Sequence, residues 1–200
     1  MIVYKIGGSL LDLPNLPEVV RRIPAGRSDA AAVLIAGGGA AADLVRTWDQ
    51  IHRLGDEAAH ELALEAMDLS ASLLARFFPE ARLVRSEQQV RRAAAEGAMC
   101  LVCAGCFVKA AESQGHSPLE RSWRTTSDSI AAWTAEVLGA ELVLVKSAPL
   151  PAGIRFDQAA RIGLVDESFP EIASRLRAVS WVNARAPDAQ IIEWFGEPVK

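Results

Sequence analysis

The sequence contains no long hydrophobic run and no excess of positive charge. Its longest apolar stretches, such as residues 99–104 and 142–145, are only as long as a strand, whereas a membrane-spanning helix needs about 20 apolar residues. We therefore expect no membrane segment, and the first residues lack the basic and apolar regions of a signal peptide. The net charge of −4 gives a nucleic-acid partner no electrostatic support. These absences favour a cytoplasmic protein that builds its charged sites locally.

Cysteine is also scarce. The three cysteines, Cys100, Cys103 and Cys106, lie close together with the spacing Cys-x-x-Cys-x-x-Cys. This spacing suggests a metal site, but the first two cysteines sit in an apolar run. No second cysteine pair or histidine pair completes a tetrahedral set of ligands. We therefore expect buried free thiols in a reducing cytoplasm and no protein-bound metal.

The pattern of the chain predicts an α/β protein. Of its 200 residues, 50% are hydrophobic and 23% are charged, as is typical of one soluble domain, which we expect to span residues 1–200. We predict strands at residues 2–6, 32–36, 81–85, 99–104, 142–146 and 179–182. We predict helices at residues 16–23, 40–54, 57–78, 87–96, 127–138 and 171–177. This alternation indicates a three-layer αβα sandwich with a mainly parallel sheet, and residues 147–170 are expected to form a loop over its edge.

Two glycine-rich turns follow predicted strands. In "VYKIGGSL" (3–10), Lys5 interrupts an apolar strand, and Gly7, Gly8 and Ser9 follow it. In "VLIAGGGAAADLVR" (33–46), three glycines at residues 37–39 connect an apolar strand to a helix. Backbone N–H groups in such turns and at a helix N-terminus bind anions, most often phosphate. The turns match neither the Walker A loop nor the dinucleotide fingerprint, so they predict an anion site of another kind.

A third segment, "WRTTSDSIAAWTAEVLGAELVLVKSA" (123–148), carries the remaining charged candidates. One of Thr125, Thr126 and Ser127 is expected to cap the helix, which places Asp128 in its first turn. Lys146 ends the next strand. A carboxylate in a first turn and a lysine at a strand end each have an ordinary structural explanation. Their combination with Lys5 and two glycine turns favours a functional site.

Together these motifs resemble the amino-acid kinase superfamily, which includes acetylglutamate, aspartate, uridylate and isopentenyl-phosphate kinases. The order and spacing of "KIGGSL", "AGGG" and "TSDSIAAW…VLVKSA" carry the resemblance from residue 3 to about residue 148. A further resemblance, to a short branch similar to the kinase of methanofuran biosynthesis, is carried by Gly37–Gly39, Ala42–Arg46, Ala59-His60, Ala66-Met67 and Trp123–Trp133. That kinase phosphorylates [5-(aminomethyl)furan-3-yl]methyl phosphate to the diphosphate.

The resemblance implies an ATP- and Mg²⁺-dependent kinase of a small phosphorylated acceptor, and we expect a homo-oligomer that binds neither nucleic acid nor membrane. Lys5 would contact the transferred phosphoryl group, Asp128 would orient the lysines, and Lys146 matches a strand-end lysine of uridylate-kinase-like members. The implied ATP contacts are Gly7, Gly8, Ser9 and Ser147. The implied acceptor contacts are Gly37, Gly38, Gly39, Asp43, Arg46, His60, Thr126 and Ser127.

Some alternatives remain open. Many family members carry an Asp-Val-Asp-Gly-like turn after the strand that ends at Lys146, whereas this chain reads "SAPLPAGI" (147–154). Because these acidic residues are missing, one alternative is a non-catalytic binding protein of the same fold. Another alternative is a kinase whose acceptor is a carboxylate or a different monophosphate. Asp43 and Arg46 form either a surface ion pair or part of the acceptor pocket, where Asp43 would pair with an aminomethyl cation. His60 and Trp123 are either packing residues or pocket residues.

Overall fold

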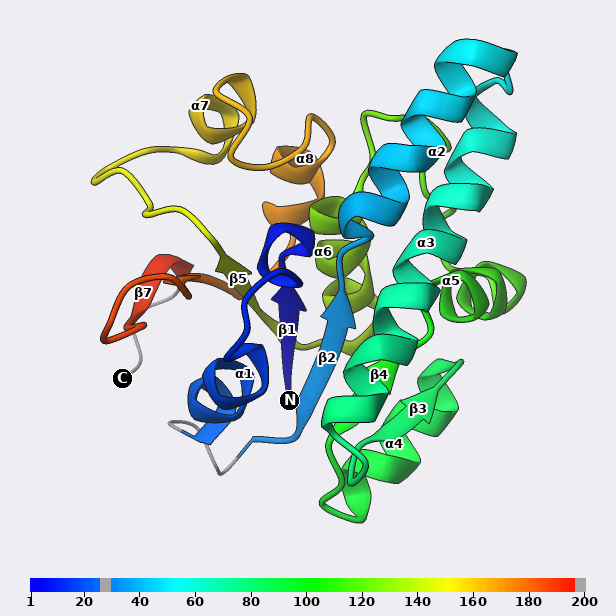
Figure 1. Ribbon diagram of the computed structural model, residues 1–200. Helices are drawn as coiled ribbons and strands as arrows, with labels where there is room; N and C mark the ends of the chain where they lie inside the picture. The colour runs from blue at the N-terminus through cyan, green and yellow to red at the C-terminus, as the bar shows by residue number, and fades with distance from the viewer. Residues whose placement is uncertain (26–29, 197–200) are drawn as a thin grey trace.

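A computed structural model describes residues 1–25 and 30–196 of the chain. Its strands form one seven-stranded sheet in the order β3-β4-β2-β1-β5-β6-β7 (Figure 1). All neighbouring strands are parallel except β7, which pairs with β6 in the antiparallel direction. The strands are β1 (Ile2–Ile6), β2 (Ala32–Ala36), β3 (Arg82–Val84), β4 (Cys100–Val102), β5 (Glu141–Lys146), β6 (Ala178–Asn183) and β7 (Ile191–Gly196).

The helices connect the strands and form the two outer layers. They are α1 (Leu16–Ala25), α2 (Gly39–His52), α3 (Asp56–Phe77), α4 (Glu87–Ala95), α5 (Ala104–Ser113), α6 (Ser127–Leu138), α7 (Phe156–Arg161) and α8 (Phe169–Ala173), with a short 3-10 turn, η1, at Gly8–Leu10. The predicted three-layer α/β fold with a mainly parallel sheet is confirmed.

Alternation along the strands divides the core into two clusters. Val3 of β1 faces a cluster with α5, α6 and α8, whereas Ile2, Tyr4 and Ile6 face a cluster with α1 and the end of α3. Successive side chains of a strand point to opposite faces, so Lys5 shares the α6 face with Val3. By the same rule Lys146 shares that face with Leu144, which packs in the α6 cluster. Because β1 and β5 are paired neighbours, the fold places both lysines beneath the same helix.

Several element predictions were wrong in detail. The strand predicted at 99–104 ends at Val102, because Ala104 already begins α5, a helix that was not predicted. The expected loop at 147–170 contains α7 and the start of α8, and the helix predicted at 171–177 lies at Phe169–Ala173. The edge strand β7 was not predicted either. The cysteines were expected to be buried, but Cys106 is exposed on α5.

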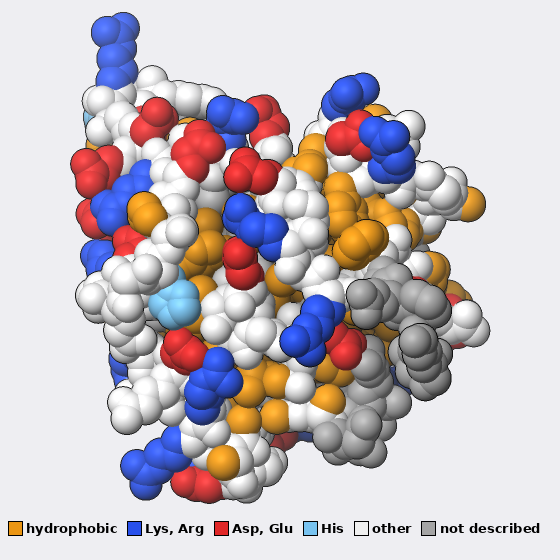
Figure 2. Space-filling view, turned by 180° about the vertical axis from the view of Figure 1, so that it is seen from behind, with side chains coloured by type: hydrophobic (Ala, Val, Ile, Leu, Met, Phe, Trp, Pro, Cys, Tyr) orange, Lys and Arg blue, Asp and Glu red, His pale blue; other side chains and the backbone are white. Residues whose placement is uncertain are grey.

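The surface carries charges of both signs. Figure 2 shows one face of the molecule, on which Lys and Arg side chains are interspersed with Asp and Glu rather than gathered into a field of one sign. Within the described residues, the helices are all too short or too polar to reach across a bilayer.

Candidate active site

Lys5, Asp128 and Lys146 meet at the carboxyl ends of β1 and β5. The Lys5 Nζ lies 2.8 Å from Asp128 Oδ1, and the Lys146 Nζ lies 2.7 Å from Asp128 Oδ2. Asp128 stands in the first turn of α6, above the two strand ends. Only 4% of the Lys5 side chain is exposed, against 16% of that of Lys146, so Lys146 is the more accessible lysine. The carboxylate therefore holds two ammonium groups side by side at the rim of the sheet.

The charge state of this triad follows from its burial. Burial alone raises the pKa of Asp128, but the charges of Lys5 and Lys146 outweigh it and lower that pKa from 3.8 to about 2. Burial, followed by repulsion from Lys5, lowers the pKa of Lys146, and Asp128 partly offsets both effects. At neutral pH Asp128 is thus a carboxylate. With both lysines protonated, the triad carries a net positive charge, which suits an anionic ligand.

The two glycine turns are in direct backbone contact. The Gly7 N–H donates to Val145 O and the Gly37 N–H donates to Ile6 O, each at 2.8 Å, so both turns continue the hydrogen bonding of the parallel strands. A Cβ on Gly8 would lie 2.4 Å from the Gly39 nitrogen, and Gly39 has a φ of +54°. Only glycine at both positions permits this approach without strain. Ser9 and Ser147 join the ends of β1 and β5 through a 2.9 Å hydrogen bond between their hydroxyl groups.

A pocket of about 210 Å³ opens beside these turns. Its lining includes the N-termini of two helices, α2 at Gly38 and Gly39 and α6 at Thr126 and Ser127. Helix N-termini carry partial positive charge and N–H groups without helical partners. At α6 the Thr126 and Ser129 N–H groups already donate to a carboxylate, so the α2 N-terminus offers the more available donors. The pocket therefore has an anion-binding end beside the turn at Gly8 and next to the helix turn that carries Asp128.

The opposite side of the pocket is formed by α2, α3 and the segment before α6. The Arg46 guanidinium lies 4.5 Å from the centre of the Trp123 ring and 3.0 Å from Asp43 Oδ1. Trp123 Nε1 donates to Asp49 Oδ2 at 2.8 Å, which fixes the indole against α2. Asp43 and Arg46 thus form an ion pair and also line the pocket.

His60, on α3, also lines the pocket. It is buried with 5% of its surface exposed. Burial, the largest influence, lowers the pKa of His60, although a hydrogen bond with the Ser122 backbone acts in the opposite direction. His60 is therefore neutral at physiological pH and offers the pocket a polar ring without charge.

Asp166 organises the start of α6 from a distant segment. Its Oδ2 accepts hydrogen bonds from Thr126 N (3.0 Å), Thr126 Oγ1 (2.8 Å) and Ser129 N (3.0 Å), and its Oδ1 accepts from Ser129 Oγ and from Phe169 N (3.1 Å). Thr126 occupies the N-cap position, but no capping bond from its side chain is present, so the predicted Thr or Ser cap is replaced by Asp166. Burial and the nearby Asp128 raise the pKa of Asp166.

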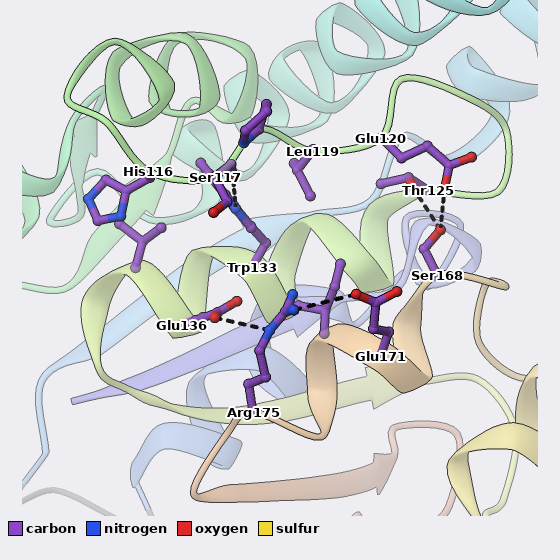
Figure 3. A pocket seen from close by; sticks show the side chains of 13 residues that line it. His116, Ser117, Leu119, Glu120, Thr125, Trp133, Glu136, Ser168, Glu171 and Arg175 are labelled. Atoms are coloured by element: carbon purple, nitrogen blue, oxygen red, sulfur yellow. Dashed lines mark hydrogen bonds and ion pairs between the residues drawn. The ribbon is translucent and has the colours of Figure 1, made fainter.

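A second pocket of about 340 Å³ lies between α6, α8 and the segment that precedes α6 (Figure 3). Arg175 reaches Glu136 at 3.0 Å and Glu171 at 3.5 Å, and Thr125 Oγ1 donates to Ser168 Oγ at 2.9 Å. The one arginine of its lining is thus already paired with carboxylates. This arrangement does not favour a phosphate. In the pocket at the glycine turns Arg46 is also paired, but the α2 N-terminus supplies backbone donors for an anion.

The structure brings most of the predicted site residues together. The Lys5–Asp128–Lys146 triad and the Ser9–Ser147 pair meet at one rim of the sheet, and the pocket lining includes most of the other predicted residues. Gly37 is the exception among the predicted acceptor contacts, because it packs against Gly8 and the Ser127 hydroxyl instead of lining the pocket. Sequence reasoning missed Asp166 and the Asp49 contact to Trp123, since no local pattern marks either carboxylate.

Comparisons with known proteins agree with this geometry. The model of the amino acid kinase family matches residues 1–149. A [5-(aminomethyl)furan-3-yl]methyl phosphate kinase of Methanocaldococcus jannaschii is 24% identical over 204 residues, covering 94% of this chain and 90% of the relative.

The fold of the chain is also similar to those of solved kinase structures. The UMP kinase of Ureaplasma parvum has a TM-score of 0.67 at 15% identity, with 96% of this chain and 97% of that chain covered. The aspartate kinase of Synechocystis has a TM-score of 0.65 at 18% identity, with all of this chain and 41% of that chain covered. The family model matches most of the chain, a kinase relative aligns with nearly all of it, and the fold is shared with other kinases. The chain therefore belongs to the amino acid kinase family and is a small-molecule kinase.

Proposed function

We propose that this kinase transfers the γ-phosphoryl group of ATP to the phosphate of a small acceptor, [5-(aminomethyl)furan-3-yl]methyl phosphate, in methanofuran-type cofactor biosynthesis. The observation that carries the proposal is the buried Lys5–Asp128–Lys146 triad at the rim where two glycine turns meet. Phosphoryl transfer needs positioning and charge neutralisation more than covalent participation by the protein. An ionised phosphate acceptor also needs no general base. A single kinase domain over residues 1–200, a homo-oligomer and a cytoplasmic location remain predictions.

We propose roles for the reacting side chains that are compatible with their geometry. Lys5 and Lys146 stabilise the negative charge that spreads over the transferred group, and Asp128 holds both ammonium groups in place. We propose that the phosphates of ATP lie against Gly7, Gly8, Ser9 and Ser147. The acceptor phosphate is proposed to bind at the α2 N-terminus, next to Thr126 and Ser127. Both oxygens of Asp128 are engaged by lysines. Mg²⁺ is therefore proposed to enter as the ATP complex, held mainly by phosphate oxygens and water, and it supplies further charge neutralisation when bound.

The pocket beside the glycine turns supports the furan acceptor in particular. Next to its anion-binding end lie the apolar side chains of Ala42, Ala63 and Met67, and Asp43 supplies a carboxylate at the same lining. A phosphate, a flat apolar ring and an aminomethyl cation match these three features in turn. The volume of about 210 Å³ is below the ~300–1,000 Å³ typical of sites for drug-sized ligands. The small size favours this acceptor over a nucleoside monophosphate.

The test is an acceptor survey with purified protein, ATP and Mg²⁺. Release of ADP is measured with [5-(aminomethyl)furan-3-yl]methyl phosphate, UMP and aspartate, and the product is identified by phosphorus NMR. We expect a diphosphate product from the furan phosphate and no reaction with the corresponding furan alcohol, which lacks the accepting phosphate. If UMP or aspartate is turned over faster than the furan phosphate, the proposed acceptor is wrong. Absence of ADP with every phosphate-bearing acceptor, despite ATP binding, would contradict the proposed reaction.

A matched pair of acceptors tests the role of Asp43. The Asp43→Asn variant should raise KM for the aminomethyl acceptor about tenfold. A charge-assisted hydrogen bond contributes about 1.5–3 kcal/mol, and we expect the lower end because 74% of the Asp43 side chain is exposed. An analogue with a methyl group in place of the aminomethyl group should show the same KM with both enzymes. An equal effect on the two acceptors would exclude Asp43 as the partner of the amine.

A further inference from the structure

A cluster of side chains that can ligate a metal lies outside the lining of the acceptor pocket, at the N-terminus of α5. Ligand atoms of Asp68, Cys103 and Cys106 all lie within 4.8 Å of one another. The Cys103 Sγ donates to Asp68 Oδ2 at 3.2 Å, and the Gly105 N–H donates to Asp68 Oδ1 at 3.2 Å. Asp68 belongs to α3 and the cysteines to the start of α5, so the cluster joins two helices that pack together (Figure 1).

The spacing of the two cysteines explains why both thiols reach the cluster. Cys103 is the N-cap of α5, and Cys106 lies in the first turn, three residues later. An N-cap side chain and the side chain three residues on meet over the same turn, as in a capping box. Gly105 lies between them, and a Cβ there would come within 3.0 Å of Asp68 Oδ2. The glycine thus leaves room for the carboxylate to approach both thiols.

The third cysteine does not belong to this cluster. The Cys100 Sγ is buried on β4 and lies 3.9 Å from Val90 O and 3.8 Å from Ala98 O. Of the Cys-x-x-Cys-x-x-Cys pattern, only the last two cysteines therefore belong to the cluster, where they lie beside an aspartate of another helix. This explains why the sequence offered no second pair of ligands nearby.

We propose that Asp68, Cys103 and Cys106 form a binding site for a thiophilic divalent cation of the zinc class. Two thiolates and one carboxylate oxygen supply three ligands of a tetrahedral ion, and a water molecule supplies the fourth, because Cys106 opens to solvent. Sulfur ligands select zinc-class ions over Mg²⁺. On binding, two metal–sulfur bonds replace two S–H bonds, two protons leave to solvent, and no atom changes oxidation state.

The ion would fasten α5 to α3 close to the acceptor pocket. Met67, which lines that pocket, directly precedes Asp68 on α3. The three ligands belong neither to the triad nor to the glycine turns, so the ion would act on the packing of α5 against α3 rather than on the transferred phosphoryl group. The proposal is independent of the identity of the acceptor.

Cobalt titration of the full-length, reduced, metal-free protein tests the site. We expect thiolate-to-cobalt charge-transfer absorption and the visible bands of a tetrahedral ion, both saturating at a single ion per chain and lost when zinc is added. Cys106→Ser should weaken binding by at least the ~10- to 100-fold that loss of an outer-shell partner costs. Asp68→Asn should weaken it as well, whereas Cys100→Ala, the matched cysteine control, should leave it unchanged.

A thermal shift supplies a second readout. Zinc should raise the Tm of the wild-type and Cys100→Ala proteins but not that of folded Cys106→Ser, since an ion stabilises only the state that binds it. The proposal would be overturned by any of three results. The first is the absence of thiolate-to-cobalt absorption, and the second is an unchanged metal affinity in Cys106→Ser. The third is a protein whose Cys103 and Cys106 form a disulfide but bind no metal when reduced.

Discussion

Asp128→Asn is the most informative single change, because it removes one charge from the triad at almost constant shape. In the wild-type protein each oxygen of the carboxylate faces one lysine, at 2.8 and 2.7 Å. An asparagine offers only one acceptor, and its NH₂ group faces the other ammonium. Removing one partner of a buried ion pair costs about 3–5 kcal/mol. We expect the lower end of this range, since burial already lowers the pKa of Lys146 and eases its deprotonation.

The assay is urea unfolding near neutral pH, where a loss of about 3 kcal/mol is a large part of the ~5–15 kcal/mol that stabilises a typical domain. Asp157→Asn is the matched control, because Asp157 pairs with Arg155 in solvent and its substitution should change stability little. If Asp128→Asn destabilises the protein no more than Asp157→Asn does, the triad is not an interdependent buried unit and the reasoning is refuted.

The pH dependence checks the sign of the effect. The folded-state pKa of Asp128, about 2, lies below its ordinary value of 3.8, so its ionisation stabilises the protein above about pH 4. This contribution is lost as the pH falls toward 2 and is of the order of 2 kcal/mol at about 1.4 kcal/mol per unit. The difference in stability between the wild type and Asp128→Asn should therefore narrow by about that amount between roughly pH 5 and pH 2. A constant difference would contradict the lowered pKa.

Three further substitutions test other parts of the site. Lys5→Ala should abolish turnover, measured as ADP release, because it removes a charge that stabilises the transferred group. Circular dichroism should show an intact fold, since Lys146 still neutralises Asp128. Near-normal activity would exclude this role for Lys5. Asp166→Ala should lower both kcat and the urea midpoint, because several N–H and hydroxyl donors lose their acceptor. Asp166→Asn should restore part of kcat and part of the urea midpoint. An effect on stability alone would mean that this residue is purely structural. Gly8→Ala should reduce kcat/KM about tenfold or more by pushing its turn away from Gly39, and unchanged kinetics would mean that the contact does not position the reacting groups.

Much of the site could be predicted because it depends on local pattern and simple topology. The bounds of β1, β2 and α6 were predicted correctly, since each is a clear apolar or helical run between turn residues. Once parallel strands are assumed, their carboxyl ends must meet at one edge of the sheet. The meeting of Lys5, Asp128 and Lys146 follows from that topology and from the two-residue period of the strands.

The parts that were missed depend on contacts between distant segments. Asp166 caps a helix that begins about 40 residues earlier, so nothing in its own neighbourhood marks it. The helix α7 has only six residues, and β7 is an edge strand held by β6 alone. Cys103 ends an apolar run that looks like continued strand, which concealed the start of α5.

The central position of β1 has a consequence for synthesis on the ribosome. β1 is made first, yet one of its two neighbours, β5, emerges only after residue 146, and Lys5 has no carboxylate to face until Asp128 is made. Until residues 128–146 have been made, the nascent chain must therefore carry Lys5 without its partner carboxylate and with one edge of β1 unpaired. Assembly of the kinase centre therefore waits until α6 and β5 have followed β1 out of the ribosome.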